Sequence, residues 1–493
     1  MGLERTVNLA RATAGRWRQH ASHGTARLTH LARTARWFNR PAVLYLSIAA
    51  YAIMLHLTYA YRISPVFFSI GLRYRTPNIA WYAIAILLVF MLAYFLPARL
   101  KKPSDIIVWI LFVMTGAPSI LVPQYADVIS QKASTELGIA VACSLLLVIL
   151  LADHGPRLSL SRFRPSSRIV WLALILFSVV VYGYMFQTVG LSIKFISLTG
   201  VQSTRFAYRE AIASHGTLLA YLIGTQGYVI NTFVMARGMY TRRWLLAFGG
   251  AIGQMLIYSI TGYKMMILSI PAALVILFLF RRSDKPFGRL IIDGTVAVGI
   301  LALLADVTRG AGQYYTFTVV FIARLMLIPG ALTAAYVHFF DGSQKAEWGY
   351  SFLSRFVDYP YSSSPAMLVG EQFSGDARVA ANVSFFGDGY ANLGYLGIAI
   401  EALVIVALLW ALNAAAEGLP MKVTSVVLLL PALGLANTSA FTSLLTGGCA
   451  VAVVVLFAIP REGWEPSAER ATGVRTALRV RSALAARGRP ERP

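Results

Sequence analysis

The chain has 493 residues, of which 57% are hydrophobic and 13% are charged, and its formal net charge is +23. A soluble domain carries about 25% charged residues, so this composition excludes a cytosolic enzyme and a free nucleic-acid-binding protein. It is typical of a polytopic membrane protein whose few charges lie at the membrane surface.

A helix that crosses a bilayer needs about 20 mostly apolar residues, and the chain offers twelve such segments. In chain order they are 41–61, 79–97, 106–124, 134–152, 169–188, 216–236, 244–262, 265–280, 290–306, 389–412, 423–440 and 442–460. These runs do not fit a β-barrel, whose strands alternate over about ten residues. We therefore predict an all-α, polytopic integral membrane protein with about 12 transmembrane helices.

Lys and Arg are distributed unevenly among the segments that join these helices. If the N-terminus is cytoplasmic, 31 of the 44 basic residues fall on the cytoplasmic side and 13 fall outside. Because cytoplasmic loops carry an excess of Lys and Arg, both basic tails, 1–40 and 461–493, are predicted to be cytoplasmic. The cytoplasmic segments then carry +22 and the outer segments +3, so the net charge reports topology and indicates no nucleic-acid partner.

This topology divides the chain into helices 1–9 (41–306), one large extracytoplasmic loop (307–388) and helices 10–12 (389–460). Within the loop, 314–340 is apolar, but a crossing there would place the basic C-terminal tail outside. It also contains Arg324 and a Pro-Gly pair, which disfavour a lipid-facing span. We predict an interfacial or re-entrant helix in a loop long enough to be functional.

Several external cations occupy positions suited to an anionic ligand. Lys264 lies in the very short turn between the seventh and eighth helices, and Arg324 lies in an apolar context. Arg and Lys bind phosphate oxygens and stabilise charge on a leaving phosphate. The candidate phosphate-binding residues are Lys264, Arg324, Arg378, Arg309, Arg205 and Arg209. The side chains of six other external cations are interpreted as extending to the lipid head groups. They are Arg62, Arg73, Arg75, Lys132, Lys194 and Lys345.

Two carboxylates, Asp293 and Glu401, fall within predicted spans. An acid inside a membrane is a functional candidate, and it introduces a proton-coupled transporter as a rival hypothesis. Partial exposure of Glu401 to a cavity would also explain its position.

No motif indicates a cofactor or a metal. The run from Gly387 to Gly397 lacks the Lys and the preceding strand of a phosphate-binding loop, so it predicts helix entry and close helix packing. The His residues are scattered and none has zinc-ligand spacing.

Four segments carry a resemblance to a known family. They are ISPVFF (63–68), ITGYKMMIL (260–268), ARLMLIPGALTAAYVHFF (323–340) and FFGDGYANLGYLGIAIEALVI (385–405). With the number of spans, the cytoplasmic termini and the late external loop, the chain resembles the O-antigen polymerase (Wzy-type) oligosaccharide repeat unit polymerases. The likeness covers most of 41–460, and Gly262-Tyr263-Lys264 stands where many members have a Gly-Ser-Arg turn.

The resemblance implies a bacterial glycosyltransferase of surface polysaccharide synthesis, inverting and metal-independent, that acts outside the cytoplasmic membrane. The donor would be a glycan on undecaprenyl pyrophosphate, and the acceptor a new lipid-linked repeat unit. A flippase and a chain-length regulator would be its partners.

The resemblance also suggests roles for the candidate residues. Lys264, Arg324 and Arg378 would hold the pyrophosphate. Arg205, Arg209 and Arg309 would form a second anionic contact. Asp388 and Glu210 are the candidates for the general base that the acceptor hydroxyl needs, whereas Asp376 is most simply an ion-pair partner of Arg378.

Two alternatives remain open. A ligase would move a finished glycan from the same lipid carrier to another acceptor, and the sequence does not separate it from a polymerase. A membrane transporter or lipid-linked glycan flippase would favour repeat-related polar spans, and the chain shows no internal repeat.

Overall fold

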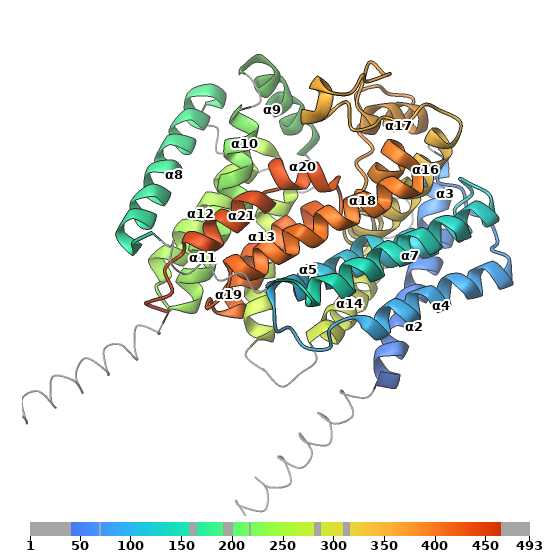
Figure 1. The fold of residues 1–493 in the computed structure, drawn as a ribbon, viewed down its shortest axis with the longest axis horizontal. Helices are drawn as coiled ribbons and strands as arrows, with labels where there is room; N and C mark the ends of the chain where they lie inside the picture. The colour runs from blue at the N-terminus through green and yellow to red at the C-terminus, as the bar shows by residue number, and fades with distance from the viewer. Residues whose placement is uncertain are drawn as a thin grey trace, which may run out of the picture.

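The computed structural model describes residues 41–68, 71–156, 165–190, 201–215, 218–280, 287–308 and 316–464. Within these ranges the regular structure is helical, apart from one isolated antiparallel bridge between Tyr74 and Ala126. Figure 1 shows the helices gathered into one tilted bundle. The predicted all-α, polytopic membrane architecture is confirmed.

The first half of the chain supplies fourteen helical elements of the described part. They are α2 (Pro41–Thr58), η1 (Tyr59–Ile63), α3 (Ser64–Phe67), α4 (Ile79–Phe95), α5 (Pro103–Leu111), η3 (Phe112–Gly116), α6 (Ala117–Tyr125), α7 (Gln131–Asp153), α8 (Ser167–Val189), α9 (Val201–His215), α10 (Leu218–Thr225), η5 (Gln226–Ile230), α11 (Asn231–Tyr240) and α12 (Trp244–Thr261). Three of them, η1, η3 and η5, are π-helical turns that continue one helix into the next.

The second half supplies the remaining described elements. They are α13 (Lys264–Leu279), α14 (Phe287–Val307), α15 (Thr316–Thr318), η6 (Val319–Leu327), α16 (Ile328–Asp341), η7 (Phe352–Arg355), α17 (Pro365–Ser374), α18 (Phe385–Ala415), α19 (Met421–Leu435), α20 (Ala440–Leu445) and α21 (Cys449–Ala458).

Each of the twelve predicted spans coincides with one helix or with a run of joined helices. In the described ranges, ten helices are long and apolar enough to cross a membrane, and α4, α13 and α19 are shorter apolar helices. Nine of these ten coincide with predicted spans. The remaining one is the continuous rod α15–η6–α16, Thr316–Asp341, inside the predicted external loop.

Segments predicted to share the cytoplasmic side meet at one end of the bundle, the lower end in Figure 1. Lys102, which precedes α5, forms an ion pair of 2.6 Å with Asp153 at the end of α7. The Trp410 indole donates to the Leu151 carbonyl at 2.8 Å, so the end of α18 joins the same group. We call this end the inner end and the opposite one the outer end, and which of them faces the cytoplasm stays a prediction.

The rod Thr316–Asp341 begins and ends near outer-end residues. Its first turn is capped by Asp306 at the end of α14, whose carboxylate accepts the backbone N–H groups of Phe317 and Thr318 at 3.1 and 2.7 Å. At its other end, Asp341 accepts the Tyr390 hydroxyl at 3.0 Å. Asp341 also shares a cavity with Arg75 and Asp127 from the outer-end connections before α4 and before α7. These contacts favour the predicted interfacial or re-entrant course.

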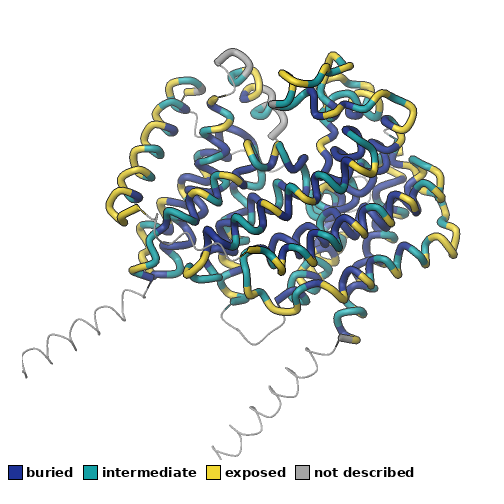
Figure 2. The backbone as a smooth tube through the Cα atoms, viewed as in Figure 1, coloured by how far each residue is buried: buried dark blue, intermediate teal, exposed yellow. Residues whose placement is uncertain are grey.

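The core forms around the continuous helix α5–η3–α6, Pro103–Tyr125, of which 94% of the apolar window is buried. It packs against α7, α16, α18 and α19, and Figure 2 shows the dark blue buried tube concentrated there. By contrast, only 17% of the window of α8 is buried, and Leu172, Leu176 and Val179 are exposed. Exposed apolar side chains on a helix of this length are suited to contact with lipid.

Candidate functional site

Three basic side chains from three separate elements lie at the outer end, near enough for their charges to interact. They are Arg205 of α9, Lys264 at the first position of α13 and Arg324 of η6, and we call them the cation cluster. The positive charges of Arg205 and Arg324 both act on the Lys264 ammonium group, and Arg324 acts on Arg205 in the same way. Residues separated by up to 119 positions in the chain thus contribute to one region of positive electrostatic potential.

The tight turn between α12 and α13 positions Lys264. Gly262 adopts the left-handed conformation, with φ of 66°, that commonly terminates a helix, and its N–H bonds to the Tyr258 carbonyl at 2.9 Å. The Thr261 hydroxyl accepts the Tyr263 N–H at 3.1 Å, so α13 restarts at once. The Gly262 carbonyl accepts Nε of Arg205 at 3.1 Å, which attaches α9 to this turn.

The π-helical segment η6 positions Arg324. Its neighbours Ala323 and Met326 are buried, whereas Arg324 is exposed. A π-helix is rare and occurs frequently at functional sites, because its wider turn changes the direction in which side chains point. The basic group is therefore exposed on a segment, Val319–Leu327, whose other residues are apolar.

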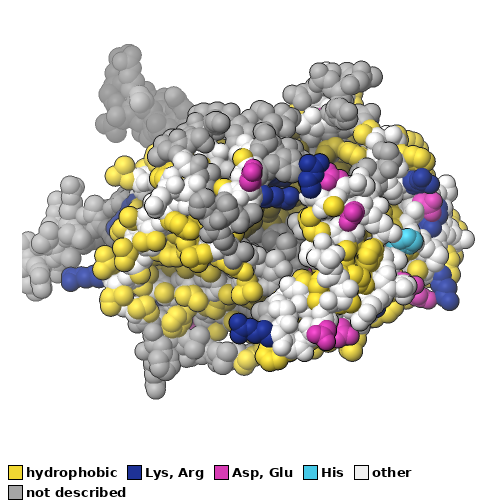
Figure 3. All heavy atoms as spheres, turned by 90° about the horizontal axis from the view of Figure 1, so that it is seen from above, with side chains coloured by type: hydrophobic (Ala, Val, Ile, Leu, Met, Phe, Trp, Pro, Cys, Tyr) yellow, Lys and Arg dark blue, Asp and Glu magenta, His cyan; other side chains and the backbone are white. Residues whose placement is uncertain are grey.

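The cation cluster has no acidic partner in the described part of the chain. None of its side chains is among the ion pairs found there. Burial lowers the pKa of Arg205 from its usual value, and the charges of Arg324 and Arg209 lower it further. A bound anion would remove this repulsion, so the cluster is suited to a phosphate-bearing ligand. Figure 3, the outer end seen from above, shows Lys and Arg side chains near the middle of this face.

The other candidate cations differ in position. Arg209 is exposed on α9, and its charge acts on Arg205 and Tyr263, so it lies at the edge of the cluster. Arg309 lies outside the described residues. Arg378 forms two bonds to Asp376, from Nε at 2.9 Å and from Nη2 at 2.8 Å, which confirms the ion pair expected from their spacing. The structure therefore does not place Arg378 with the cluster.

The candidate acid Asp388 belongs to a buried network. Its carboxylate accepts the Tyr350 hydroxyl at 2.7 and 2.8 Å and the Asn392 amide at 3.0 Å. It also lies near enough to the carboxyl group of Glu401 for the two acids to interact electrostatically. We call Trp348, Tyr350, Asp388, Asn392 and Glu401 the carboxyl network. Its hydrogen-bond partners include no member of the cation cluster.

Glu401 is fully buried, so the expectation of partial exposure to a cavity is wrong. Its Oε1 accepts the Trp348 indole N–H at 3.2 Å, and its Oε2 accepts the Ala440 N–H at 2.9 Å. Glu401 thereby joins the external loop, α18 and the start of α20. The other intramembrane acid, Asp293, forms an ion pair of 3.1 Å with Arg289 one turn away. Both acids thus have partners that account for their positions.

A sharp kink in α18 makes the network possible. The helix breaks at Leu393 and Gly394, where Gly394 has φ of 62°, and the two halves fold against each other. A Cβ atom on Gly389 would lie 2.7 Å from the Gly397 backbone, so only glycine fits there. The predicted close packing of the glycine-rich run is confirmed, and it brings Asp388 beside Glu401 thirteen residues later.

The second candidate acid, Glu210, is exposed on α9. In the part of the chain that the structure describes, no hydrogen bond or ion pair of its side chain is found. It shares its helix with Arg205 and follows Arg209 directly. Of the two predicted bases, Glu210 is the accessible one.

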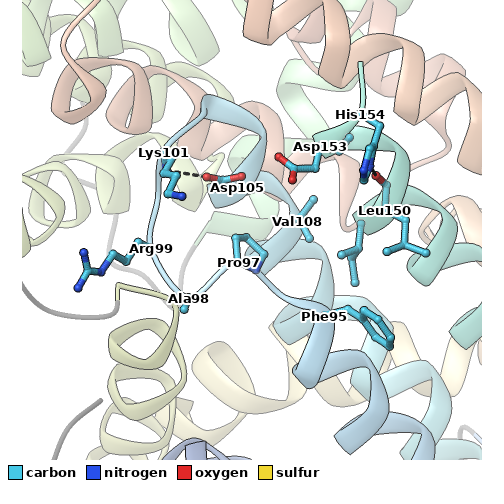
Figure 4. Close-up of a pocket in the computed structure, with 12 residues that line it drawn as sticks. Phe95, Pro97, Ala98, Arg99, Lys101, Asp105, Val108, Leu150, Asp153 and His154 are labelled. Carbon is cyan, nitrogen blue, oxygen red and sulfur yellow. Dashed lines mark hydrogen bonds between the residues drawn. The ribbon is translucent and has the colours of Figure 1, made fainter. Parts of the chain in front are cut away.

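A cavity of about 400 Å³ lies at the inner end, lined by residues that include Arg99, Lys101, Asp105 and Asp153 (Figure 4). Its acids already have partners. Asp105 accepts the Lys101 and Lys102 N–H groups at 2.6 and 2.9 Å, and Asp153 is paired with Lys102. The bundle separates this cavity from the cation cluster, so it is not part of the same site.

Sequence reasoning did not find Trp348, Tyr350 or Asn392. Asn392 caps a turn in which Glu347 and Trp348 have positive φ, since its Oδ1 accepts the Trp348 N–H at 2.6 Å. The available signal was Gly394 inside a helical pattern, because glycine favours interruptions of regular structure.

In comparisons with known proteins, no family model, no curated protein and no solved structure matches this chain.

Proposed function

We propose that the protein is a membrane glycosyltransferase that polymerises undecaprenyl-pyrophosphate-linked oligosaccharide repeat units into a surface polysaccharide. The observation that carries the proposal is the cation cluster, Arg205, Lys264 and Arg324, which has no acidic partner in the described residues. A pyrophosphate at the membrane surface is an anion that fits it. The sequence resemblance to the O-antigen polymerases supports the same substrate class.

The proposed chemistry is an inverting transfer at the outer face of the bacterial cytoplasmic membrane. The acceptor hydroxyl attacks the anomeric carbon of the donor glycan, the new glycosidic C–O bond forms, and the C–O bond to the pyrophosphate breaks. Lys264 and Arg324 stabilise the negative charge that develops on the leaving pyrophosphate, which is the role that metal ions serve elsewhere. The transfer thus needs no metal ion.

The hydroxyl proton passes to a carboxylate base. Asp388 is 7% exposed and its oxygens accept hydrogen bonds from Tyr350 and Asn392. Glu210 is exposed and shares α9 with Arg205, so within this proposal Glu210 is the base and Asp388 maintains the loop.

Two observations bear on the alternatives. Asp293 is paired with Arg289, and Glu401 is hydrogen-bonded on both oxygens, so neither acid supports a proton relay through the membrane. This lowers the support for a transporter or a flippase. A ligase would use the same cation cluster and the same donor, and the experiment below separates the two enzymes.

The test is a chain-extension assay with purified protein in lipid vesicles, supplied only with lipid-linked repeat units extracted from the source cells. We expect a ladder of longer lipid-linked glycans, with or without a chelator of divalent metals. Extension only after a second acceptor is added would make the protein a ligase. Transport of the repeat units across the vesicle membrane, with no extension, would overturn the proposal.

A further inference from the structure

A second cavity lies at the outer end, away from the cation cluster. It has a volume of about 510 Å³, and its polar lining comes from Arg75, Asp127, Ser130, His338 and Asp341. We call it the outer pocket. Its size lies in the range of pockets that bind small molecules, and the proposed chemistry does not involve it.

One wall of the outer pocket is fixed by backbone pairing. The Arg75 N–H bonds to the Tyr125 carbonyl at 2.8 Å, and the Asp127 N–H bonds to the Arg73 carbonyl at 3.0 Å. The Arg75 guanidinium donates to the Ile129 and Pro123 carbonyls at 2.8 and 3.2 Å and pairs with Asp127 at 3.5 Å. Arg75 is therefore held by protein groups, and its charge is balanced by Asp127.

The other wall is the last turn of α16. His338 and Asp341 are exposed there, three residues apart and so on one side of the helix. The Tyr390 hydroxyl donates to Oδ1 of Asp341 at 3.0 Å. In the described ranges no hydrogen bond to Oδ2 of Asp341 or to the His338 ring is found, so both groups are free to bind a ligand.

The charges of the lining select the ligand class. One Arg and two Asp give the pocket a formal charge of −1 with His338 neutral, so it disfavours phosphate. Asp341, His338 and Ser130 offer hydrogen-bond acceptors and donors, while Val128, Ile129 and Val337 add apolar surface. In the described residues no group of three His, Cys, Asp or Glu is placed to hold a metal ion. Polar groups on an apolar wall suit a hydroxyl-rich, uncharged ligand.

The outer pocket and the cation cluster are joined by one continuous helix. Arg324 and His338 lie fourteen residues apart on the continuous rod Thr316–Asp341, which corresponds to about 20 Å along a helix. A ligand with an anionic end and a hydroxyl-rich end could contact both sites at once. A glycan on a pyrophosphate lipid has both ends.

We propose that the outer pocket binds a sugar unit of the lipid-linked oligosaccharide, at a distance along the rod from its pyrophosphate. This inference rests on the proposed function and adds the site that holds the saccharide. The rod then acts as a spacer that keeps the sugar and the pyrophosphate apart.

The test uses the free oligosaccharide, released from extracted lipid-linked repeat units by mild acid, so that no phosphate is present. Binding to the purified full chain is measured calorimetrically for the wild type, Asp341→Asn, His338→Ala and Arg324→Ala. We expect the first two variants to weaken binding about tenfold each, because each loses a hydrogen bond to the saccharide. Arg324→Ala should bind the free oligosaccharide as the wild type does. Asp358→Asn, an exposed carboxyl at the same end, is the matched control.

Equal affinity of the wild type, Asp341→Asn and His338→Ala would overturn the inference, as would no binding by the wild type. Both substituted residues are exposed, and unchanged thermal unfolding of each variant shows that it folds. Failure of the pocket proposal can be distinguished from failure of the proposed function. Chain extension by the wild type, combined with unaltered binding in the two variants, keeps the polymerase and removes the pocket.

Discussion

The cation cluster and the carboxyl network are two groups of charged residues that the fold treats in opposite ways. In the network, Glu401 is fully buried and both of its oxygens accept hydrogen bonds, and Asp388 is bonded by Tyr350 and Asn392. In the cluster, three cations lie together without an acidic partner in the described residues. Charged groups whose hydrogen bonds are made within the protein stabilise the fold, whereas like charges without a partner are suited to binding a ligand of opposite charge. We therefore expect mutations in the two groups to have different effects.

The largest effect is expected from removing a cation. Lys264→Ala and Arg324→Ala should each reduce the rate of chain extension at least about 100-fold, because each removes a group that stabilises the leaving pyrophosphate. The midpoint of thermal unfolding should stay the same, since neither side chain bonds to a carboxylate in the described part.

The matched control for both is Lys132→Ala, whose side chain is 79% exposed at the same end and pairs only weakly with Glu136 at 3.9 Å. Glycan ladders of near-normal rate in Lys264→Ala and Arg324→Ala would remove the pyrophosphate site.

Mutations in the carboxyl network should lower the stability of the protein rather than its rate of chain extension. Glu401→Ala leaves the Trp348 indole and the Ala440 N–H without their acceptor in the interior, which should lower the free energy of unfolding by about 3 kcal/mol. Glu401→Gln keeps one acceptor oxygen and should lose less. Thermal unfolding in detergent measures both. A large loss of extension rate with unchanged unfolding would instead make Glu401 part of the chemistry and break the contrast between the two groups.

A smaller effect separates charge from geometry within the cluster. Arg324→Lys retains the positive charge but loses the planar fork that binds two phosphate oxygens at once, so extension should slow about tenfold. Steady-state rates at several ionic strengths measure this. If Arg324→Lys extends chains as slowly as Arg324→Ala, the positive charge alone contributes nothing to the rate at this position.

The smallest effect is expected at Arg378, a candidate that the structure places with Asp376. Arg378→Ala should change extension by less than about twofold, in line with exposed ion pairs. The Arg378 hydrogen bonds lower the pKa of Asp376 from 3.8 to about 2. The ion pair is therefore complete above pH 4 and is lost only as the pH falls through 2, so rates between pH 5 and 9 should have the same profile in both proteins. A larger loss would return Arg378 to the ligand site.

The helices could be predicted from the sequence because hydrophobicity over twenty residues is a local property. The Arg378–Asp376 pair and the close approach of Gly389 to Gly397 also follow from short spacings. The resemblance grouped Lys264 and Arg324 with Arg378 and put Arg205 in a second contact, so it did not give the grouping of Arg205 with Lys264 and Arg324. Nothing local to α9, α13 or η6 relates these residues. The same limit explains the failure at Glu401, whose partners Trp348 and Ala440 lie 53 and 39 residues away.

The outer pocket also could not be predicted from the sequence, because it is formed by residues far apart in the chain. Arg75 was expected to reach lipid head groups, but its guanidinium donates to the carbonyls of Pro123 in α6 and of Ile129 in the connection before α7. His338 was only one of several scattered histidines. Neither residue was predicted as a binding group, because the pocket forms only where two connections meet the last turn of α16.

The π-helical segment η6 has a consequence for how this protein tolerates insertions and deletions. Loss of one residue from Val319–Leu327 would rotate the part of the rod before the deletion relative to the part after it. The Ser119–Thr333 bond of 2.9 Å and the packing of Gly330 on Pro118 hold the far part of the rod in place. The rotation would then fall on Arg324, which would turn into the core. The helical register of Val319–Leu327 therefore determines whether the Arg324 side chain faces its ligand or the protein interior.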